Sequence, residues 1–322
     1  MKDYLNYQGD LSKLSKKDLE YLFLLLKDYQ LQYKECLGID EKISFGVEVE
    51  FEDILLYYVA KELKQYPEFR YWSCIPDKSC SYKIDDFVVG GEVVTPILHD
   101  IPIDWQMLSA AVEILKKLGA NSTKRTSLHV HVGGQIFGED IKNVVRFVKV
   151  WCIFEAVIFK FACGEDKDFR PNILYFAHPI SEAVKLKCKY IPGFLENLLI
   201  PKGLGFDKKW AISFQNYYDL ISEEEVNNML EIRIANGTLK KEIIQNTIYF
   251  YLKLMLYVMS DKYDEALINS LFQKLRVKDF SKYSEIYAKE ALMLADLIFD
   301  NTFDKINFLK QYVKKEETVF MR

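Results

Sequence analysis

Three glutamates alternate with apolar residues in one short run of the chain. Glu48, Glu50 and Glu52 are each separated by one residue, and the residues around them are Val47, Val49 and Phe51. Because side chains alternate faces along a strand, the three carboxylates are expected on one face and the apolar residues on the other. Like charges on one strand face are unfavourable unless cations lie between them, and carboxylate oxygens suit Mg²⁺ or Mn²⁺. The alternative is an amphipathic surface strand.

A second run has the same alternation with histidines. His129 and His131 are expected on one face of a strand, and the opposite face is Leu128, Val130 and Val132. Imidazole suits Mn²⁺ or Zn²⁺, and one histidine can hold a metal while its neighbour donates to a phosphate oxygen. The alternative is a pair of structural histidines.

Two further runs place charged residues on apolar strands. Glu231 and Arg233 alternate with Leu230, Ile232 and Ile234. A carboxylate and a guanidinium on one buried face imply either a mutual salt bridge or a site for metal and phosphate. Glu92 follows Gly90 and Gly91, a pair that permits a bulge. Its alternative is an edge-strand charge.

Together these runs predict one composite site. If the four strands belong to one curved sheet, its concave face gathers the acids and a histidine around divalent ions, with Arg233 at the edge. Such a site suits ATP, whose phosphates need cations to offset their charge during transfer.

The same segments resemble the amidoligases, a family of the carboxylate–amine ligase superfamily that includes glutamine synthetase and glutamate–cysteine ligase. The resemblance covers residues 43–239, and its motifs are Phe45–Glu50, Asp77–Ser79, Gly91–Leu98, His129–Val132, Glu231–Arg233 and Gly237–Leu239. It implies ATP-dependent joining of a carboxylate to an amine through an acyl phosphate, with Mg²⁺ or Mn²⁺ as cofactor. The substrates are then small molecules or peptides.

The resemblance also implies roles for individual residues. The positions that match metal ligands are Glu48, Glu50, Glu92, His129 and Glu231. His131 and Arg233 match phosphate-contacting positions, and Arg170 corresponds to a second phosphate-binding arginine, with a solvated loop arginine as the alternative. Asp77 matches an acidic position near the acceptor site. Asp77 or Glu52 is expected to hold or deprotonate the incoming ammonium.

The order of elements predicts an α+β fold. Strands are expected at 43–51, within 71–95, at 127–133 and at 229–235, and helices at 12–33, 53–66, 104–118, 139–162 and from 239 onward. Asp104 is expected to cap its helix, and residues 164–219 to be irregular. By the resemblance, the sheet is curved, mainly antiparallel and a partial barrel like the catalytic fold of glutamine synthetase. We expect a helical extension at 1–40, a catalytic domain at 41–240 and a helical region at 241–322 packed on it.

Composition narrows the class of protein. The chain has 322 residues, 50% hydrophobic, with a net charge of −4, so it can bury a full core but lacks the basic footprint of a nucleic-acid-binding protein. The apolar stretch 141–163 is interrupted by charges at helical intervals, which predicts a core helix rather than a membrane span. The N-terminus lacks a secretory signal pattern, so a cytoplasmic location is expected. A homo-oligomer is compatible with the sequence.

Two other functions remain open from the sequence. A metal-dependent hydrolase or phosphotransferase would use a similar set of ligands. A non-catalytic interaction protein that keeps the fold would use its helical ends as binding surfaces.

Overall fold

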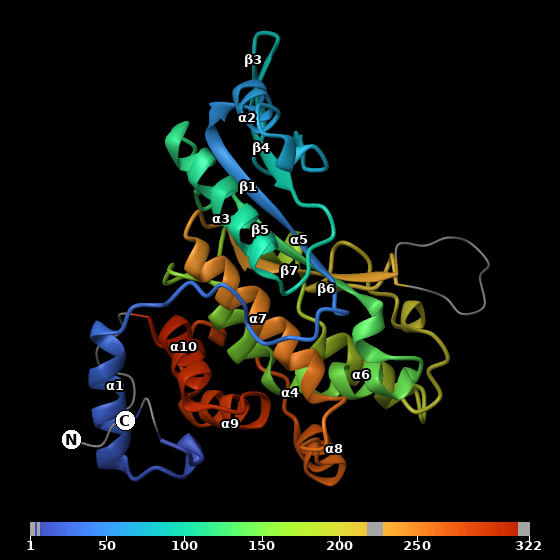
Figure 1. Cartoon of the computed structure of the whole chain (residues 1–322). Coiled ribbons are helices and arrows are strands. Elements are labelled where there is room, and N and C mark those ends of the chain that lie inside the picture. The colour runs from blue at the N-terminus through green and yellow to red at the C-terminus, as the bar shows by residue number, and fades with distance from the viewer. Residues whose placement is uncertain (1–3, 5–6, 218–227, 315–322) are drawn as a thin grey trace.

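One antiparallel sheet runs through the structure, a computed structural model that describes residue 4 and residues 7–217 and 228–314 (Figure 1). Its strands are β1 (Phe45–Leu55), β2 (Ser73–Ile75), β3 (Tyr82–Ile84), β4 (Phe87–Val94), β5 (Ser127–Gly133), β6 (Ile212–Ser213) and β7 (Met229–Asn236). The strand order is β2-β4-β1-β5-β7-β6, and β3 also pairs with β4. All of these pairings are antiparallel. The predicted α+β class and the four ligand-bearing strands are confirmed.

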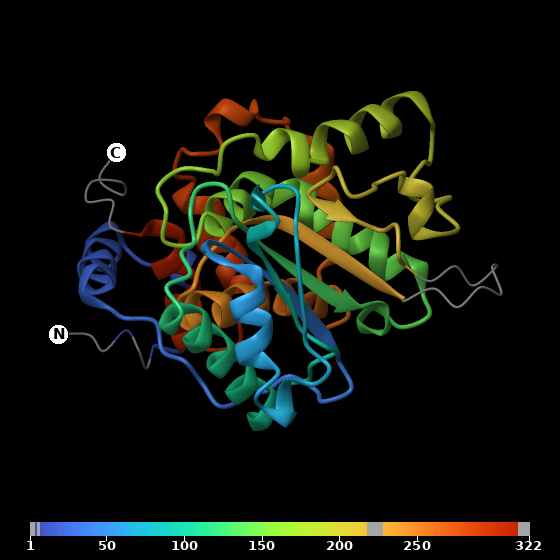
Figure 2. The ribbon, with the colours of Figure 1, turned by 90° about the horizontal axis from the view of Figure 1, so that it is seen from above.

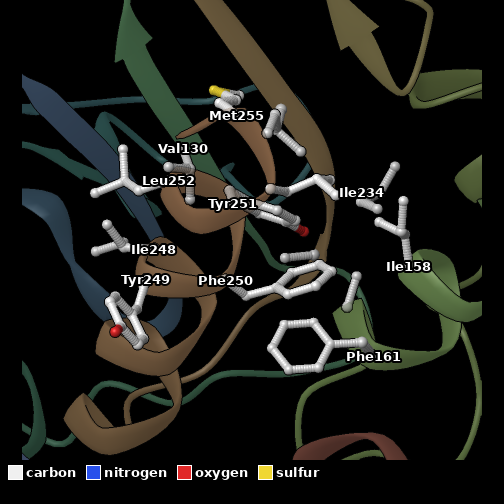
Figure 3. Close-up of a cluster of buried hydrophobic side chains, with 14 of the residues drawn as sticks. Val130, Ile158, Phe161, Ile234, Ile248, Tyr249, Phe250, Tyr251, Leu252 and Met255 are labelled. Atoms are coloured by element: carbon white, nitrogen blue, oxygen red, sulfur yellow. The ribbon is translucent and has the colours of Figure 1, made fainter. Parts of the chain in front are cut away.

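Helices cover one face of this sheet. The long helices α4 (Ile141–Ala162) and α7 (Lys241–Tyr257) pack on β7 and β5, and α3 (Pro102–Lys117) packs on α7 (Figures 1 and 2). Figure 3 shows the core between them, where Val130 and Ile234 from the strands meet Ile158 and Phe161 of α4 and Leu252 of α7. This core holds the apolar side of β5 and β7, so their opposite side is left for polar residues.

The expectation that 141–163 forms a core helix is confirmed. Nearly every residue of α4 is buried, including Lys149, Glu155 and Lys160. Glu155 accepts hydrogen bonds from Trp151 Nε1 at 3.1 Å and Tyr283 Oη at 2.9 Å, which satisfies a charged group inside the core. In the described part of the chain, none of the helices is both long enough and apolar enough to cross a membrane.

The remaining helices lie at the two ends of the chain, directly after β1 and in the long connection before β6. They are α1 (Lys16–Asp28), α2 (Leu56–Leu63), α5 (Ile173–Phe176), α6 (Ser181–Tyr190), α8 (Glu265–Lys274), α9 (Ala288–Ile298) and α10 (Thr302–Val313). Short 3₁₀ helices occur at Leu11–Lys13, Pro67–Phe69, Gly134–Phe137, Pro201–Leu204 and Phe280–Lys282. The helix expected at 12–33 is found as the shorter α1, and the helices expected beyond 239 are found up to residue 313; residues 315–322 lie outside the described part, as do 1–3 and 5–6.

Three local predictions were wrong. The helix after the first strand starts at Leu56 rather than at residue 53, because β1 continues to Leu55. Asp104 does not cap α3, which starts at Pro102; its carboxylate accepts from His99 N at 2.7 Å instead. The region 164–219 is not wholly irregular, since it contains α5, α6 and β6, and residues 218–219 are outside the described part.

A bulge between β1 and β4 re-aims the end of β1. Between the pairs Phe51↔Gly91 and Leu55↔Val89, β1 advances by four residues and β4 by two. Gly90 has φ +76°, and a Cβ there would lie 2.7 Å from Cys80 O and 3.0 Å from Phe51 O. Only glycine can bring β4 this close to both backbones. The irregularity therefore lies opposite the glycine pair, but its extra residues are in β1, and Glu92 keeps regular pairing with Glu50 rather than being re-aimed by the glycines.

The first prediction concerns this close approach. Gly90→Ala should lower the free energy of unfolding through both the φ penalty, about 1–2 kcal/mol, and the clash with two carbonyls, about 1–3 kcal/mol more. Gly38 is a matched control, because it has the same φ of +76° and nothing within 4 Å of its Cβ position. Gly38→Ala should lose only the φ penalty. Urea denaturation measures both, and equal losses would contradict the steric account.

Candidate functional site

The strand register places the predicted ligand residues on one face. Glu48 pairs with His129 across β1 and β5, Glu50 pairs with Glu92 across β1 and β4, and His131 pairs with Glu231 across β5 and β7. Paired residues of antiparallel strands point to the same side of the sheet. The four strands therefore assemble a single polar face, as the alternation predicts.

Glu48 lies at the centre of this face between the two histidines. Its Oε2 is 2.7 Å from His129 Nδ1, and its Oε1 is 3.0 Å from His131 Nε2. Burial raises the pKa of the Glu48 carboxyl, but the hydrogen bonds and charges of both histidines outweigh burial and hold this pKa well below its usual range. Glu48 is therefore a carboxylate at neutral pH.

Glu50 is the most deeply buried of the three glutamates, with 1% of its surface exposed. Its Oε2 accepts from Ser127 N at 2.7 Å and from Ser79 Oγ at 3.2 Å, and its Oε1 accepts from Ser127 Oγ. His129 Nε2 lies 3.9 Å from the same Oε1. The donors around Glu50 come from β5 and from the turn after β2, so the carboxylate connects both to β1.

Glu92 lies beside Glu50 without such support. Its carboxyl group makes no hydrogen bond or ion pair with any described residue. Burial, and then the charges of Glu48, Asp77, Glu50 and Glu231, raise the pKa of Glu92 to about 8. Burial and the neighbouring carboxylates therefore favour the neutral form of Glu92 at pH 7.

Two sets of ligand atoms on this face are close enough to hold metal ions. The ligand atoms of Glu48, Glu92 and His129 lie within 4.8 Å of one another, and so do those of Glu48, His131 and Glu231. Carboxylate oxygens with one imidazole each suit Mg²⁺ or Mn²⁺. The sets share Glu48, so they describe two neighbouring positions.

Asp77 stands in the turn that follows β2 and reaches the face through Ser79. Ser79 Oγ donates to Asp77 Oδ1 and lies 3.2 Å from Glu50 Oε2. Asp77, Glu50 and Cys80 form a third set of atoms within 4.8 Å. Burial raises the pKa of the Cys80 thiol, which lies 3.5 Å from Gly91 O, so this cysteine stays neutral and is a poor ligand.

Glu52 lies at the far end of β1 and is held by a different turn. Its carboxylate accepts from Thr123 Oγ1, and its Oε1 lies 3.2 Å from Arg125 Nε. Arg125 Nη2 also donates to Ser79 O at 3.2 Å. Arg125 therefore joins the turn at 121–126 to the turn at 76–81 and neutralises Glu52.

Arg233 and Arg170 border the acids on the side of β7. Arg233 Nη1 forms an ion pair with Glu231, which is the mutual salt bridge that the sequence left open. Arg170 is only 4% exposed, so the alternative of a solvated loop arginine is wrong. Its Nη2 donates to Arg233 O at 2.8 Å. Burial lowers the pKa of Arg170 to about 10, with Glu50 opposing and Arg233 adding to this shift.

Two buried polar atoms at this site have no partner among the described residues. They are His131 Nδ1 and Arg170 Nε. Buried polar atoms are rarely left without a hydrogen bond, so each such atom in a native structure needs an explanation. Both atoms belong to residues for which the sequence predicts phosphate contacts.

A cavity adjoins the Glu48 end of the face. It has a volume of about 560 Å³ and lies where β1 begins and β5 ends. Glu48 and His131 form its inner edge, while Ile97 and Met229 provide apolar walls. The cavity has room for the part of a ligand that extends beyond the charged face.

Several residues that shape the site were missed from the sequence. Ser127 stands two residues before His129 on the same strand face, a signal that the alternation contained. Ser79 lies within the motif Asp77–Ser79, but its hydrogen bond to Glu50 depends on how the turn folds. Arg125 and Asn236 carried no sequence signal, because their partners lie far away in the chain.

Comparison with known proteins supports part of this description. Residues 41–168 match the sequence model of a family described as "putative amidoligase enzyme", which is about two-fifths of the chain. The matched segment contains β1 to β5 and therefore Glu48, Glu50, Glu92 and both histidines. It ends before Arg170, Glu231 and Arg233. A search of curated proteins found no match. The chain is therefore similar to this family over the segment that carries the first five strands.

Proposed function

We propose that this protein is an ATP-dependent carboxylate–amine ligase. The observation that carries the proposal is the pair of overlapping ligand sets that share Glu48, on a face bordered by two arginines. The family match over residues 41–168 supports the ligase class. By resemblance, we further infer that the sheet is related to the partial barrel of glutamine synthetase.

The residues fit a divalent metal site. Glu48, Glu92 and His129 would hold one ion, and Glu48, His131 and Glu231 a second, with Glu50 next to both sets. The raised pKa of Glu92 supports this assignment, because a cation offsets the repulsion between the acids. Such ions, when bound, offset the negative charge of the phosphates during transfer.

The two arginines would contact phosphoryl oxygens. Arg170 has an unpartnered Nε, and Arg233 is its immediate neighbour. A substrate carboxylate oxygen attacks the γ-phosphorus of ATP, the bond to the β–γ bridging oxygen breaks, and ADP leaves. The product is an acyl phosphate. The guanidinium groups stabilise the charge that spreads over the transferred phosphoryl oxygens.

An amine then completes the reaction. The nitrogen attacks the acyl carbon, phosphate leaves with the oxygen that came from the carboxylate, and the nitrogen loses a proton. Asp77 is better suited than Glu52 to hold the ammonium or accept this proton. Glu52 is already neutralised by Arg125, whereas Asp77 lies beside Glu50 on the acidic face.

The hydrolase or phosphotransferase alternative uses the same ligands with another acceptor. It differs in the fate of oxygen atoms, which an isotope experiment can follow. The expected sign of the interaction-protein alternative is the loss of a metal ligand, whereas the predicted ligand residues are all present and lie on one face.

The second prediction tests the reaction. The protein is incubated with ATP, Mg²⁺ and pooled amino acids and short peptides whose carboxylates carry ¹⁸O. A ligase should form ADP, a product one water lighter than the sum of two substrates, and phosphate that contains one ¹⁸O atom. Mass spectrometry detects both products. Phosphate without the label would indicate hydrolysis, and no ADP at all would contradict the proposal.

The third prediction tests the metal site through stability. Because its pKa is raised to about 8, Glu92 is mostly protonated at pH 7, and Glu92→Gln resembles this neutral form; the unliganded variant should therefore unfold at about the same temperature as the wild type at pH 7. Mg²⁺ with ATP should stabilise the wild type by about 2.7 kcal/mol when the ligand is present at a hundred times its Kd. The variant should lose most of this stabilisation, because it lacks one metal ligand. Thermal unfolding measures both effects.

The control for this experiment is Glu113→Gln. Glu113 is an exposed residue of α3 in an ion pair with Lys116, and it belongs to none of the three sets of ligand atoms. This variant should keep the full stabilisation by Mg²⁺ and ATP. Equal stabilisation of Glu92→Gln and the wild type would remove Glu92 from the metal site.

A further inference from the structure

We propose that Asn236 is a positioning residue that aims Arg170 at the phosphoryl group of the substrate. The proposal rests on the function proposed above. Asn236 is the last residue of β7, is 5% exposed, and lies beside the segment that carries Arg170.

A bulge in β7 directs Asn236 towards the site. Simple alternation along β7 would put Asn236 on the apolar face of Ile232 and Ile234. Between the pairs Leu128↔Ala235 and Val130↔Ile232, however, β5 advances by two residues and β7 by three. The extra residue in β7 reverses the alternation beyond it. Asn236 then pairs with Ser127 and shares the face of the ligand residues.

The side chain of Asn236 binds the 166–170 segment at three points. Its Oδ1 accepts from Arg170 N at 3.1 Å. Its Nδ2 donates to Asp166 Oδ2 and to Asp168 O, both at 3.0 Å. One amide group therefore fixes the backbone on both sides of Phe169 and the start of the segment.

These partners determine the orientation of the amide. The reverse orientation would place Oδ1 against two oxygen acceptors and Nδ2 against an N–H, which satisfies none of the three bonds. An aspartate at this position cannot donate to Asp166 or Asp168 either. Position 236 therefore requires a side chain with one acceptor and two donors, and among residues of this size asparagine alone provides them.

The three hydrogen bonds of Asn236 help to keep Arg170 buried. A charged guanidinium tends to return to water unless its backbone and partners hold it in place. Arg170 is held by Asn236 at its N–H and by Arg233 O at its Nη2, so its Nε stays buried and free to donate. The charges of Glu50 and Asp77 lie near enough to act on the Arg170 guanidinium, whose Nε has no partner among the described residues. A phosphoryl oxygen bound between the metals and Arg170 would accept this hydrogen bond.

The experiment compares Asn236→Ala with a matched truncation, Asn143→Ala. Asn143 is also buried and bonded, to Phe137 O at 2.9 Å and Arg146 Nη1 at 3.2 Å, but lies at the start of α4. Two readouts need no ligand. The first is amide hydrogen exchange of residues 166–176. The second is the ¹⁵N–¹H resonance of Arg170 Nε, identified by its loss in Arg170→Lys.

A third readout is the affinity for pyrophosphate in the presence of Mg²⁺, measured by calorimetry. We expect Asn236→Ala to accelerate exchange at 166–176, to broaden or remove the Arg170 resonance and to weaken pyrophosphate binding about ten- to a hundredfold. Asn143→Ala should change none of these, although both variants lose stability. In the Arg170→Lys background, Asn236→Ala should cost no further affinity, because the group that it positions is gone.

Each other outcome has a defined meaning. Unchanged hydrogen exchange and an unchanged Arg170 resonance in Asn236→Ala would show that Asn236 does not hold the 166–170 segment in place. A loosened segment with undiminished pyrophosphate affinity, or additive losses in the double variant, would overturn its role in aiming Arg170. If the wild type binds no pyrophosphate with Mg²⁺, the proposed phosphate site fails, while exchange and resonance still decide whether Asn236 positions Arg170.

Discussion

Repulsion between carboxylates buried on one sheet face is the constraint on which the site depends. Glu48 is offset by two histidines, Glu50 by three hydrogen bonds, Glu52 by Arg125 and Glu231 by Arg233. Glu92 alone has no partner among the described residues. Burial and the neighbouring carboxylates raise the pKa of Glu92. A cation bound beside Glu92 would offset this repulsion and lower its pKa.

Apolar packing on the opposite side of the sheet holds these carboxylates in register. Large aromatic and aliphatic side chains of α4 and α7 pack under β5 and β7 (Figure 3). With one face committed to a dry core, a strand cannot shift by one residue without burying its charges in that core. The register that brings Glu48 opposite His129 is therefore maintained by apolar packing on the other side.

Two bulges in the sheet position residues that regular strand pairing would point elsewhere. The bulge opposite Gly90 ends the regular pairing of β1 and β4 after Phe51 and Gly91, and Glu52 within it pairs with Asn121 instead. The bulge in β7 turns Asn236 towards the segment that carries Arg170. The metal-ligand acids and the histidines lie where strand pairing is regular. The position of Arg170 depends instead on the bulge in β7.

The sequence by itself determined the faces of the strands. Alternation in β1, β5 and β7 correctly grouped the glutamates, the histidines and Arg233, because antiparallel neighbours preserve the two-residue period wherever pairing is regular. Tertiary structure alone decided the burial of Arg170, the neutralisation of Glu52 by Arg125 and the aim of Asn236. It also decided the helices within 164–217 and the start of α3 at Pro102. These features depend on a bulge or on partners remote in the chain, and local residue patterns contain no information about either.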